Sequence, residues 1–445
     1  MRIDRNNSQA KNLFNEIVRN QKLGIPAGIC SICSSNSYVI EAVIEKSLID
    51  KTHILIESTS NQVNQFGGYT QMNPEMFRDF VLSFSRKAGL PSDQIIFGGD
   101  HLGPFPWRNE KADSAMDKAC EMVSQYVKAG FIKIHLDASM PLGDDPAGRP
   151  LDAQIIAGRG AILCHAAEKA FKEIGGESGL FNGPHVYVIG TEVLTPGGSH
   201  EIKDSIEVTE VSDFEETIKC FREAFFKYKL EGAWDRVFAI VAQPGVEFEQ
   251  YKIHDYNSEN AKELCKALRK YPNLVFEGHS TDYQKKSALR QMVKDGIAIL
   301  KVGPALTYAV REALFVLNYI ENELFQNNPG INLSHFTDVL ENAMIRNPQN
   351  WINHYKGDEI KLKFDRKYSL FDRCRYYLTD SEVQNSINLL IRNLSKREIP
   401  LTLISQFLPN QYEKIRNSCL KNDPASLIKD KVADVLDDYS YAVAE

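Results

Sequence analysis

Histidines and acidic residues stand where several short apolar segments end, and these residue types bind metal ions and move protons. Asp100 and His101 close the segment IIFGGDH, and His279 follows LVFEG just ahead of Ser280 and Asp282. Imidazole nitrogens act as metal ligands and as proton carriers, so we interpret His101 and His279 as metal ligands or catalytic groups. The alternative is that they complete a buried hydrogen-bond network.

Other apolar segments carry polar side chains at matching positions. His135 and Asp137 are two residues apart, which puts both on one face of an extended segment. We predict catalytic roles for Asp100, Asp137 and Glu192, with ordinary ion pairing to Lys133 or Lys301 as the alternative. The predicted substrate-binding residues are Glu57, Gln243, Ser280, Asp282, Lys301 and Gly303.

Lys301 lies inside the apolar segment IAILKVG, where a lysine is either a Schiff-base amine or an ion-paired group. A neutral amine needs apolar surroundings, and several acids are expected near this one, so we favour the ion pair. Gly303 and Pro304 then precede a predicted helix that begins near Ala305, and the backbone amides of this turn are a candidate site for a phosphate.

The elements that position these residues are eight short apolar segments, each followed by a stretch with helical periodicity. They begin at Ile25, His53, Ile95, Ile132, His185, Arg236, Leu274 and Ile297. Their almost continuous apolar character is typical of parallel strands covered on both faces, and eight βα units close a (β/α)8 TIM barrel. The carboxyl ends of such strands form one rim, so we expect the polar residues to meet there.

Beyond about residue 305 the apolar residues follow a helical period only. We therefore predict a barrel over residues 1–320 and a helical C-terminal subdomain over residues 321–445. The remaining histidines fall at strand starts, in helices or in loops, and we expect structural roles for His53, His165 and His185 and solvated positions for His200, His254, His335 and His354.

Composition limits the partners and the compartment. The net charge of −7 argues against a nucleic-acid partner. The sequence holds no apolar run of about 20 residues, so we expect no membrane partner and a cytoplasmic protein. Eight scattered cysteines indicate reduced thiols, and Cys30 and Cys33 are expected to be buried in a strand.

Several longer strings together resemble one family, and they run from about residue 10 into the C-terminal helices. They are IESTSNQVNQFGGYT, GGDHLGP, KIHLDASM, VIGTEVLTPGG, QPGVEF, EGHSTDYQ, ILKVGPALTYAVREALF and SLFDRCRYY. The sequence resembles the Z subunit of D-tagatose-1,6-bisphosphate aldolase, whose barrel is similar to that of class II, zinc-dependent aldolases. The resemblance implies phosphorylated ketoses of tagatose and galactitol metabolism as ligands, and homo- or hetero-oligomers.

In class II aldolases three histidines hold a zinc ion that polarises the ketose carbonyl, while an aspartate moves the hydroxyl proton. His101 and His279 match two of these zinc ligands, and Asp100 matches the aspartate. A third histidine is expected at the end of strand six, where this sequence has Gln243. The Gln243 carbonyl or the Glu192 carboxylate would then complete a shell for Zn²⁺ or another divalent metal, or tight zinc binding is lost.

Two functions follow from the resemblance. The first is an accessory, non-catalytic subunit that activates and stabilises a separate Y-type aldolase subunit. The alternative is a stand-alone, metal-dependent fructose-6-phosphate/tagatose-6-phosphate 4-epimerase that works by retro-aldol cleavage and re-addition. A kinase is disfavoured and no nucleotide is expected, because the sequence lacks the motif GxxxxGK[ST].

Overall fold

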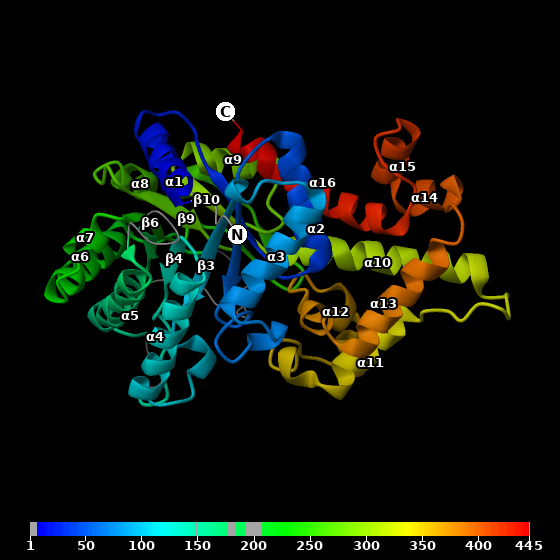
Figure 1. Cartoon of the computed structure of the whole chain (residues 1–445), viewed down its shortest axis with the longest axis horizontal. Helices are drawn as coiled ribbons and strands as arrows, with labels where there is room; N and C mark the ends of the chain where they lie inside the picture. Colours follow the sequence, from blue (N-terminus) through cyan, green and yellow to red (C-terminus); the bar gives the residue numbers. More distant parts are fainter. Residues whose placement is uncertain (1–6, 147–149, 177–183, 192–205, 445) are drawn as a thin grey trace.

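A closed barrel of parallel strands forms the centre of the protein, in a computed structural model that describes residues 7–146, 150–176, 184–191 and 206–444 (Figure 1). The barrel strands are β1 (Ile29–Cys33), β2 (Ile54–Thr59), β3 (Ile95–Leu102), β4 (Lys133–Leu136), β5 (Val186–Ile189), β6 (Val237–Val241), β9 (Val275–Gly278) and β10 (Ile297–Val302). β1 pairs with both β2 and β10, which closes the cylinder. The predicted (β/α)8 TIM barrel is confirmed, and each strand lies inside the segment predicted for it except β3, which extends one residue further, to Leu102.

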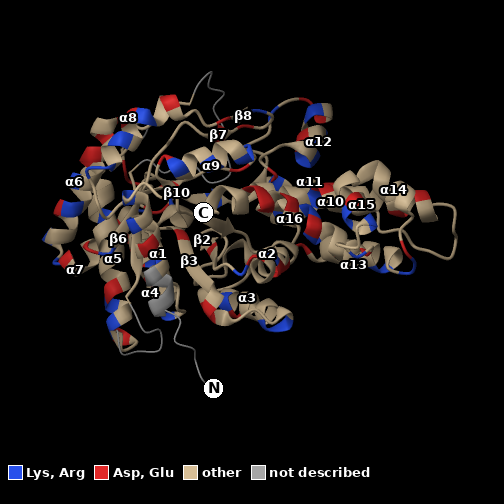
Figure 2. Cartoon of the chain, turned by 90° about the horizontal axis from the view of Figure 1, so that it is seen from above, with Lys and Arg blue, Asp and Glu red and all other residues tan. Residues whose placement is uncertain are grey.

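Helices surround the barrel because each connection carries an apolar stripe toward the strands. They are α2 (Ser37–Asp50), α3 (Pro74–Ala88), α4 (Ala112–Lys128), α5 (Ala153–Glu173), α6 (Val211–Lys227), α7 (Glu231–Trp234), α8 (Ser258–Leu268), α9 (Lys286–Lys294) and α10 (Pro304–Phe325). Asn36, Asn73 and Asp152 accept backbone amides at the starts of α2, α3 and α5. Basic and acidic residues are interspersed over the outer helices (Figure 2).

The amino-terminal helix α1 (Asn7–Lys22) covers the end of the barrel where the strands begin. Phe14 is fully buried, and its ring lies 4.6 Å from that of Phe238 on β6. Ile17 joins the same apolar cluster as Ile96 and Val275, near the starts of β3 and β9. This end is therefore filled with apolar side chains, and the polar residues gather at the opposite rim.

The C-terminal region is helical, as predicted, and its last helix returns to the barrel. Its helices are α11 (Phe336–Arg346), α12 (Glu359–Tyr368), α13 (Ser381–Leu394), α14 (Leu401–Phe407), α15 (Pro409–Arg416) and α16 (Pro424–Val443). α16 packs against α2, α9 and α10, and the Tyr439 hydroxyl donates to the carbonyl of Thr281 at 2.8 Å. The division at residue 320 stays a prediction, and that residue lies within α10.

The stretch after β6 forms a short antiparallel hairpin that the sequence analysis did not predict. It pairs β7 (Glu247–Phe248) with β8 (Ile253–His254). His254 lies 2.6 Å from a Glu249 oxygen, so the prediction of a solvated His254 is wrong. Within the described ranges, no helix has the length and apolar character needed to cross a membrane.

Candidate active site

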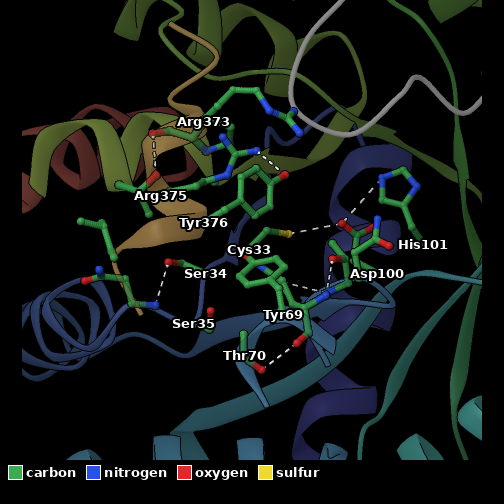
Figure 3. A pocket seen from close by; sticks show the side chains of 18 of the residues that line it. Cys33, Ser34, Ser35, Tyr69, Thr70, Asp100, His101, Arg373, Arg375 and Tyr376 are labelled. Atoms are coloured by element: carbon green, nitrogen blue, oxygen red, sulfur yellow. Dashed lines mark hydrogen bonds and ion pairs between the residues drawn. The ribbon is translucent and has the colours of Figure 1, made fainter. Parts of the chain in front are cut away.

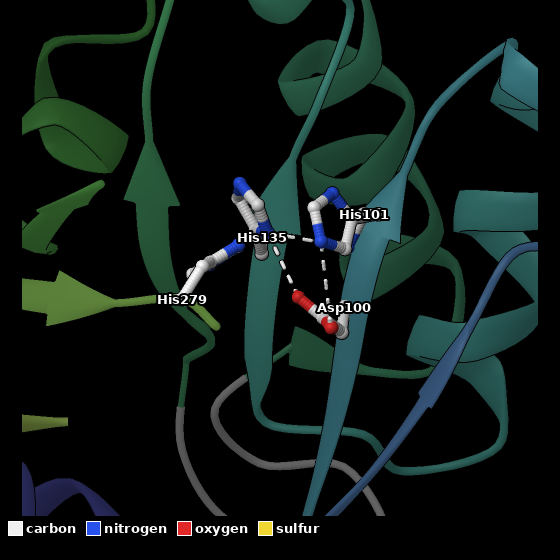
Figure 4. A group of neighbouring side chains, drawn as sticks. All are labelled: Asp100, His101, His135 and His279. Atoms are coloured by element: carbon white, nitrogen blue, oxygen red, sulfur yellow. Dashed lines mark hydrogen bonds and ion pairs between the residues drawn. The ribbon is translucent and has the colours of Figure 1, made fainter. Parts of the chain in front are cut away.

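Three histidines from three strands converge at the rim of the barrel where the strands end (Figure 4). His101 lies on β3, His135 on β4 and His279 directly after β9. Their ring centroids are 5.0 Å apart for His101 and His135, 4.8 Å for His101 and His279, and 5.3 Å for His135 and His279. With Asp100 they offer four ligand atoms that lie within 4.8 Å of one another.

Two of the imidazole rings each contact a carboxylate through one ring nitrogen. The Nδ1 atom of His101 lies 2.8 Å from Asp137, and the Nε2 atom of His279 lies 2.9 Å from Glu277. Each contact leaves the other ring nitrogen available. A carboxylate that orients a histidine in this way is the usual outer partner of a metal-binding imidazole.

His135 completes the set and carries an unsatisfied atom. Its Nδ1 lies 3.0 Å from Asp100 Oδ1, and the backbone amide of His101 approaches the same nitrogen at 3.1 Å. Its Nε2 is buried and has no hydrogen-bond partner among the described residues. Three imidazoles and one carboxylate are a donor set that suits zinc and related divalent metals, so the residues present fit such an ion.

Charged side chains beneath the histidines form a buried network. Lys301 contacts Glu57 and lies 2.9 Å from Asp100, while Lys133 lies 2.6 Å from Glu57 and 2.7 Å from Glu277. Burial alone would lower the pKa of Lys301, but the carboxylates of Asp100 and Glu57 outweigh it and raise this pKa well above its usual value. Lys301 is therefore a charged, ion-paired group, as favoured above, and not a neutral Schiff-base amine.

The opposing effects of burial and nearby carboxylates also set the pKa values of His101 and His279. Burial disfavours the charged form of His101, yet the carboxylates of Asp100 and Asp137 outweigh it and raise the pKa of His101. For His279 burial prevails over the Glu277 hydrogen bond and lowers the pKa to about 4. His279 is thus a neutral imidazole near pH 7, which is the form that binds metals.

Comparison with known proteins assigns the family. Residues 14–444 match the family model described as D-tagatose-1,6-bisphosphate aldolase subunit GatZ/KbaZ-like. The chain belongs to the GatZ/KbaZ-like family. It is also 40% identical to a probable tagatose 6 phosphate kinase from Sinorhizobium meliloti 1021, with a TM-score of 0.84 over 93% of this chain and 100% of that one.

Two aldolase structures are more distant. The YdjI aldolase from Escherichia coli K12 is 12% identical, with a TM-score of 0.39 over 86% of this chain and 96% of that one. The fructose-bisphosphate aldolase from Campylobacter jejuni is 15% identical, with a TM-score of 0.41 over 88% of this chain and 93% of that one. These two likenesses are too remote to bear on the chemistry of the site.

The third histidine of this GatZ/KbaZ-like chain comes from β4, not from the end of strand six. The sequence analysis paired His135 with Asp137 on one face but did not count His135 as a ligand. Gln243, at the position where we expected the third ligand, accepts the amides of Gly245 and Val246 at 2.8 and 2.9 Å through its side-chain carbonyl. That carbonyl is therefore engaged within its own loop.

A cavity of about 870 Å³ opens over His101 and His279 and is lined by many of the predicted residues. The predicted residues that line it are Asp100, His101, His279, Ser280, Asp282, Lys301 and Gly303. Within the described part of the chain, the residues that line the cavity do not include Glu57, Asp137 or Gln243. Glu57 instead contacts Lys301, and Asp137 contacts His101. Glu192 and His200 lie outside the described residues.

Cys33, at the end of β1, also faces this cavity. Its Sγ lies 3.4 Å from Asp100 Oδ2, and the thiol is free like those of the other seven cysteines. Burial raises the pKa of the Cys33 thiol well above its usual value. Cys33 is therefore a neutral neighbour of Asp100.

Asp282 occupies the helix terminus that we had considered as a phosphate site. One of its oxygens accepts the amides of Gly303 at 3.0 Å and Ala305 at 2.8 Å, at the start of α10. These two amides are consequently not free for a phosphate. Burial raises the pKa of Asp282 to about 6, although the amide hydrogen bonds act in the opposite direction.

The raised pKa predicts how Asp282→Asn changes stability with pH. Since the folded pKa of about 6 exceeds the ordinary aspartate pKa of 3.8, the contribution of Asp282 to stability is complete below pH 3.8 and is lost as the pH rises through 6. Asparagine keeps the accepting oxygen without titrating. We expect the variant to gain about 1–3 kcal/mol relative to wild type between pH 5 and pH 8.

Unfolding by urea at both pH values measures this difference. If the difference in the free energy of unfolding between variant and wild type is the same at pH 5 and pH 8, Asp282 is ionised over this whole range. Asp213→Asn, at an exposed position on α6, is the matched control and should show no such trend.

Proposed function

We propose that this chain is a metal-dependent enzyme that breaks and re-forms a carbon–carbon bond of a ketose phosphate, with 4-epimerisation of fructose 6-phosphate and tagatose 6-phosphate as its reaction. The observation that supports this proposal is the convergence of His101, His135 and His279 beside Asp100. The absence of a histidine at strand six had favoured a non-catalytic chain, whereas a third imidazole from His135 on β4 supports a catalytic one.

The three histidines would hold Zn²⁺ or another divalent metal, with Asp100 as a further ligand or neighbour. When bound, such an ion polarises the carbonyl of a ketose and stabilises the negative charge that develops on its oxygen. Asp137 and Glu277 would keep His101 and His279 oriented through the hydrogen bonds described above.

Asp100 lies in the cavity beside the histidines, and we assign to it the transfer of the hydroxyl proton. Burial disfavours its charge, but His101 and Lys301 outweigh burial and hold the pKa of Asp100 well below its usual value, so it is an ionised acceptor. It takes the proton of the C4 hydroxyl as the C3–C4 bond breaks and the C3 fragment keeps the electron pair. Addition to the opposite face of the aldehyde re-forms the bond with C4 inverted, and the proton returns.

A second candidate function rests on the family match over residues 14–444. In that case the chain is an accessory subunit that supports a Y-type aldolase. It predicts that the purified chain alone is inactive, and that adding it to a Y-type subunit raises aldolase activity and slows inactivation.

The decisive experiment incubates the purified chain with fructose 6-phosphate. We expect tagatose 6-phosphate to form, and activity to disappear after dialysis against a chelator and return with Zn²⁺ or Mn²⁺. Metal content is measured in the same samples. A parallel sample with ATP tests for a bisphosphate, which a kinase would make. No tagatose 6-phosphate at any metal loading would overturn the epimerase proposal.

A further inference from the structure

Two arginines from the C-terminal helical region face the candidate active site. Arg373 and Arg375 lie in the short helix η6 (Arg373–Tyr377), which follows α12, and both line the same cavity as Asp100 and His101. Figure 3 shows them with Tyr376 on one side of the cavity and Asp100 with His101 on the other. The chain reaches this position just after Asp372, whose backbone is left-handed with φ 45°.

Neither guanidinium forms an ion pair with a carboxylate within the described part of the chain. Arg311, a buried arginine nearby, lies 3.4 Å from Asp372 and so has an acid of its own. The Asp372 carboxylate also accepts the Thr307 hydroxyl at 2.6 Å. The acid nearest in sequence to the two arginines is therefore already engaged.

The hydrogen-bond partners of these guanidinium groups are backbone carbonyls and a tyrosine hydroxyl. Arg373 donates through Nε to the carbonyl of Asn350. Arg375 donates to the carbonyl of Asp372 at 3.0 Å and to the hydroxyl of Tyr376 at 3.0 Å. The two guanidinium carbons lie 4.8 and 4.5 Å from the centroid of the Tyr376 ring. The ring holds both groups in place without neutralising their charge.

Burial makes this arrangement costly in the absence of an anion. Arg373 is only 7% exposed, and burial together with the charge of Arg375 lowers the pKa of Arg373. A buried cation next to a second, half-buried cation is unfavourable unless a negative group joins them. The other candidate for an anion site, the start of α10, is already capped by Asp282.

We infer that Arg373 and Arg375 bind the terminal phosphate of the sugar substrate. This inference rests on the proposed function for the identity of the sugar. The planar donors of two arginines match the oxygens of a dianionic phosphate, whereas a neutral sugar hydroxyl would leave their charge unpaired. The C3–C4 bond then lies toward the histidines and the phosphorylated end toward η6, so the C-terminal region supplies part of the substrate site.

The first test measures binding to the wild-type chain. We expect inorganic phosphate to raise the thermal unfolding temperature and to compete with fructose 6-phosphate in titration calorimetry, because ligands that bind the folded state stabilise it. Fructose without a phosphate should bind about 10- to 100-fold more weakly than fructose 6-phosphate. A wild-type chain that neither responds to phosphate nor prefers the phosphorylated sugar overturns the inference.

The second test uses Arg373→Gln and Arg375→Gln. We expect each to weaken fructose 6-phosphate binding about 10- to 100-fold and to leave fructose binding unchanged, with Arg375→Lys in between. Arg222→Gln, an exposed arginine of α6, is the matched control and should bind as wild type does. Equal weakening for both sugars would indicate a structural role and count against the inference.

These binding measurements separate this inference from the proposed reaction. If phosphate binding depends on the two arginines but no tagatose 6-phosphate forms, the anion site stands and the epimerase proposal fails. If epimerisation occurs and its KM is unchanged in folded Arg373→Gln and Arg375→Gln, the reaction stands and the anion site fails. Should both variants fail to fold, the wild-type measurements decide.

Discussion

His135→Ala is expected to abolish both metal binding and turnover. His135 supplies a buried ring nitrogen with no partner among the described residues, and its ring lies 5.0 and 5.3 Å from those of His101 and His279. Loss of an outer-shell partner typically costs about 10- to 100-fold, so loss of a ligand should reduce kcat/KM by about 1,000-fold or more. Metal content per chain should fall to near zero at micromolar free zinc.

The measurement combines elemental analysis with the fructose 6-phosphate assay. His165→Ala is the matched control, because His165 is an exposed histidine on α5 and its removal should change neither quantity. Retention of metal by folded His135→Ala would exclude His135 as a ligand. Retention of metal with loss of activity would instead give His135 a role in proton transfer.

The barrel was predictable because its signal is local and repeated. Each strand is a short apolar run bounded by polar turns, and the eight runs kept their order and their limits within a few residues in the structure. Residues at the strand ends converge by geometry alone, which is why His101, His279 and Lys301 could be assigned to one rim. The hairpin of β7 and β8 escaped prediction because strands of two residues carry no periodic pattern.

His135 and the two arginines show where such reasoning stops. His135 lies within the short strand β4, where the sequence pattern predicts a buried structural residue. Only its distances to His101 and His279 show that it belongs to the cluster. Arg373 and Arg375 follow the last barrel strand, which ends at Val302, by 71 and 73 residues. Their approach depends on how the C-terminal helices pack on the barrel, and no local pattern encodes that packing.

The buried charges beneath the site predict the largest effect on stability. Lys133 is fully buried between Glu57 and Glu277, with distances of 2.6 and 2.7 Å. Removing the amine in Lys133→Met leaves these acids without their shared cation, although Lys301 still contacts Glu57. Removal of one partner from a buried ion network costs about 3–5 kcal/mol, so we expect a loss of this size at pH 8.

The loss should shrink as the pH falls, and this trend identifies its cause. Burial disfavours the charge of Glu277, but Lys133 outweighs burial and lowers the pKa of Glu277, so Glu277 stabilises wild type above its unfolded pKa and less so in acid. Without Lys133 the folded state favours protonated Glu277, and the variant recovers at low pH. Urea unfolding of wild type and of Lys133→Met at pH 8 and pH 5 measures the difference in their free energies of unfolding at each pH.

Lys262→Met provides the control, since Lys262 and Glu259 form an exposed pair at 3.2 Å with side chains 64% and 78% exposed. Exposed pairs contribute about 0–1 kcal/mol, so this variant should unfold almost as wild type does. A Lys133→Met loss that is equal at both pH values would point to lost packing instead of uncompensated charge. A pH-dependent loss would show that the charges which orient His279 and hold Lys301 also govern the stability of the barrel.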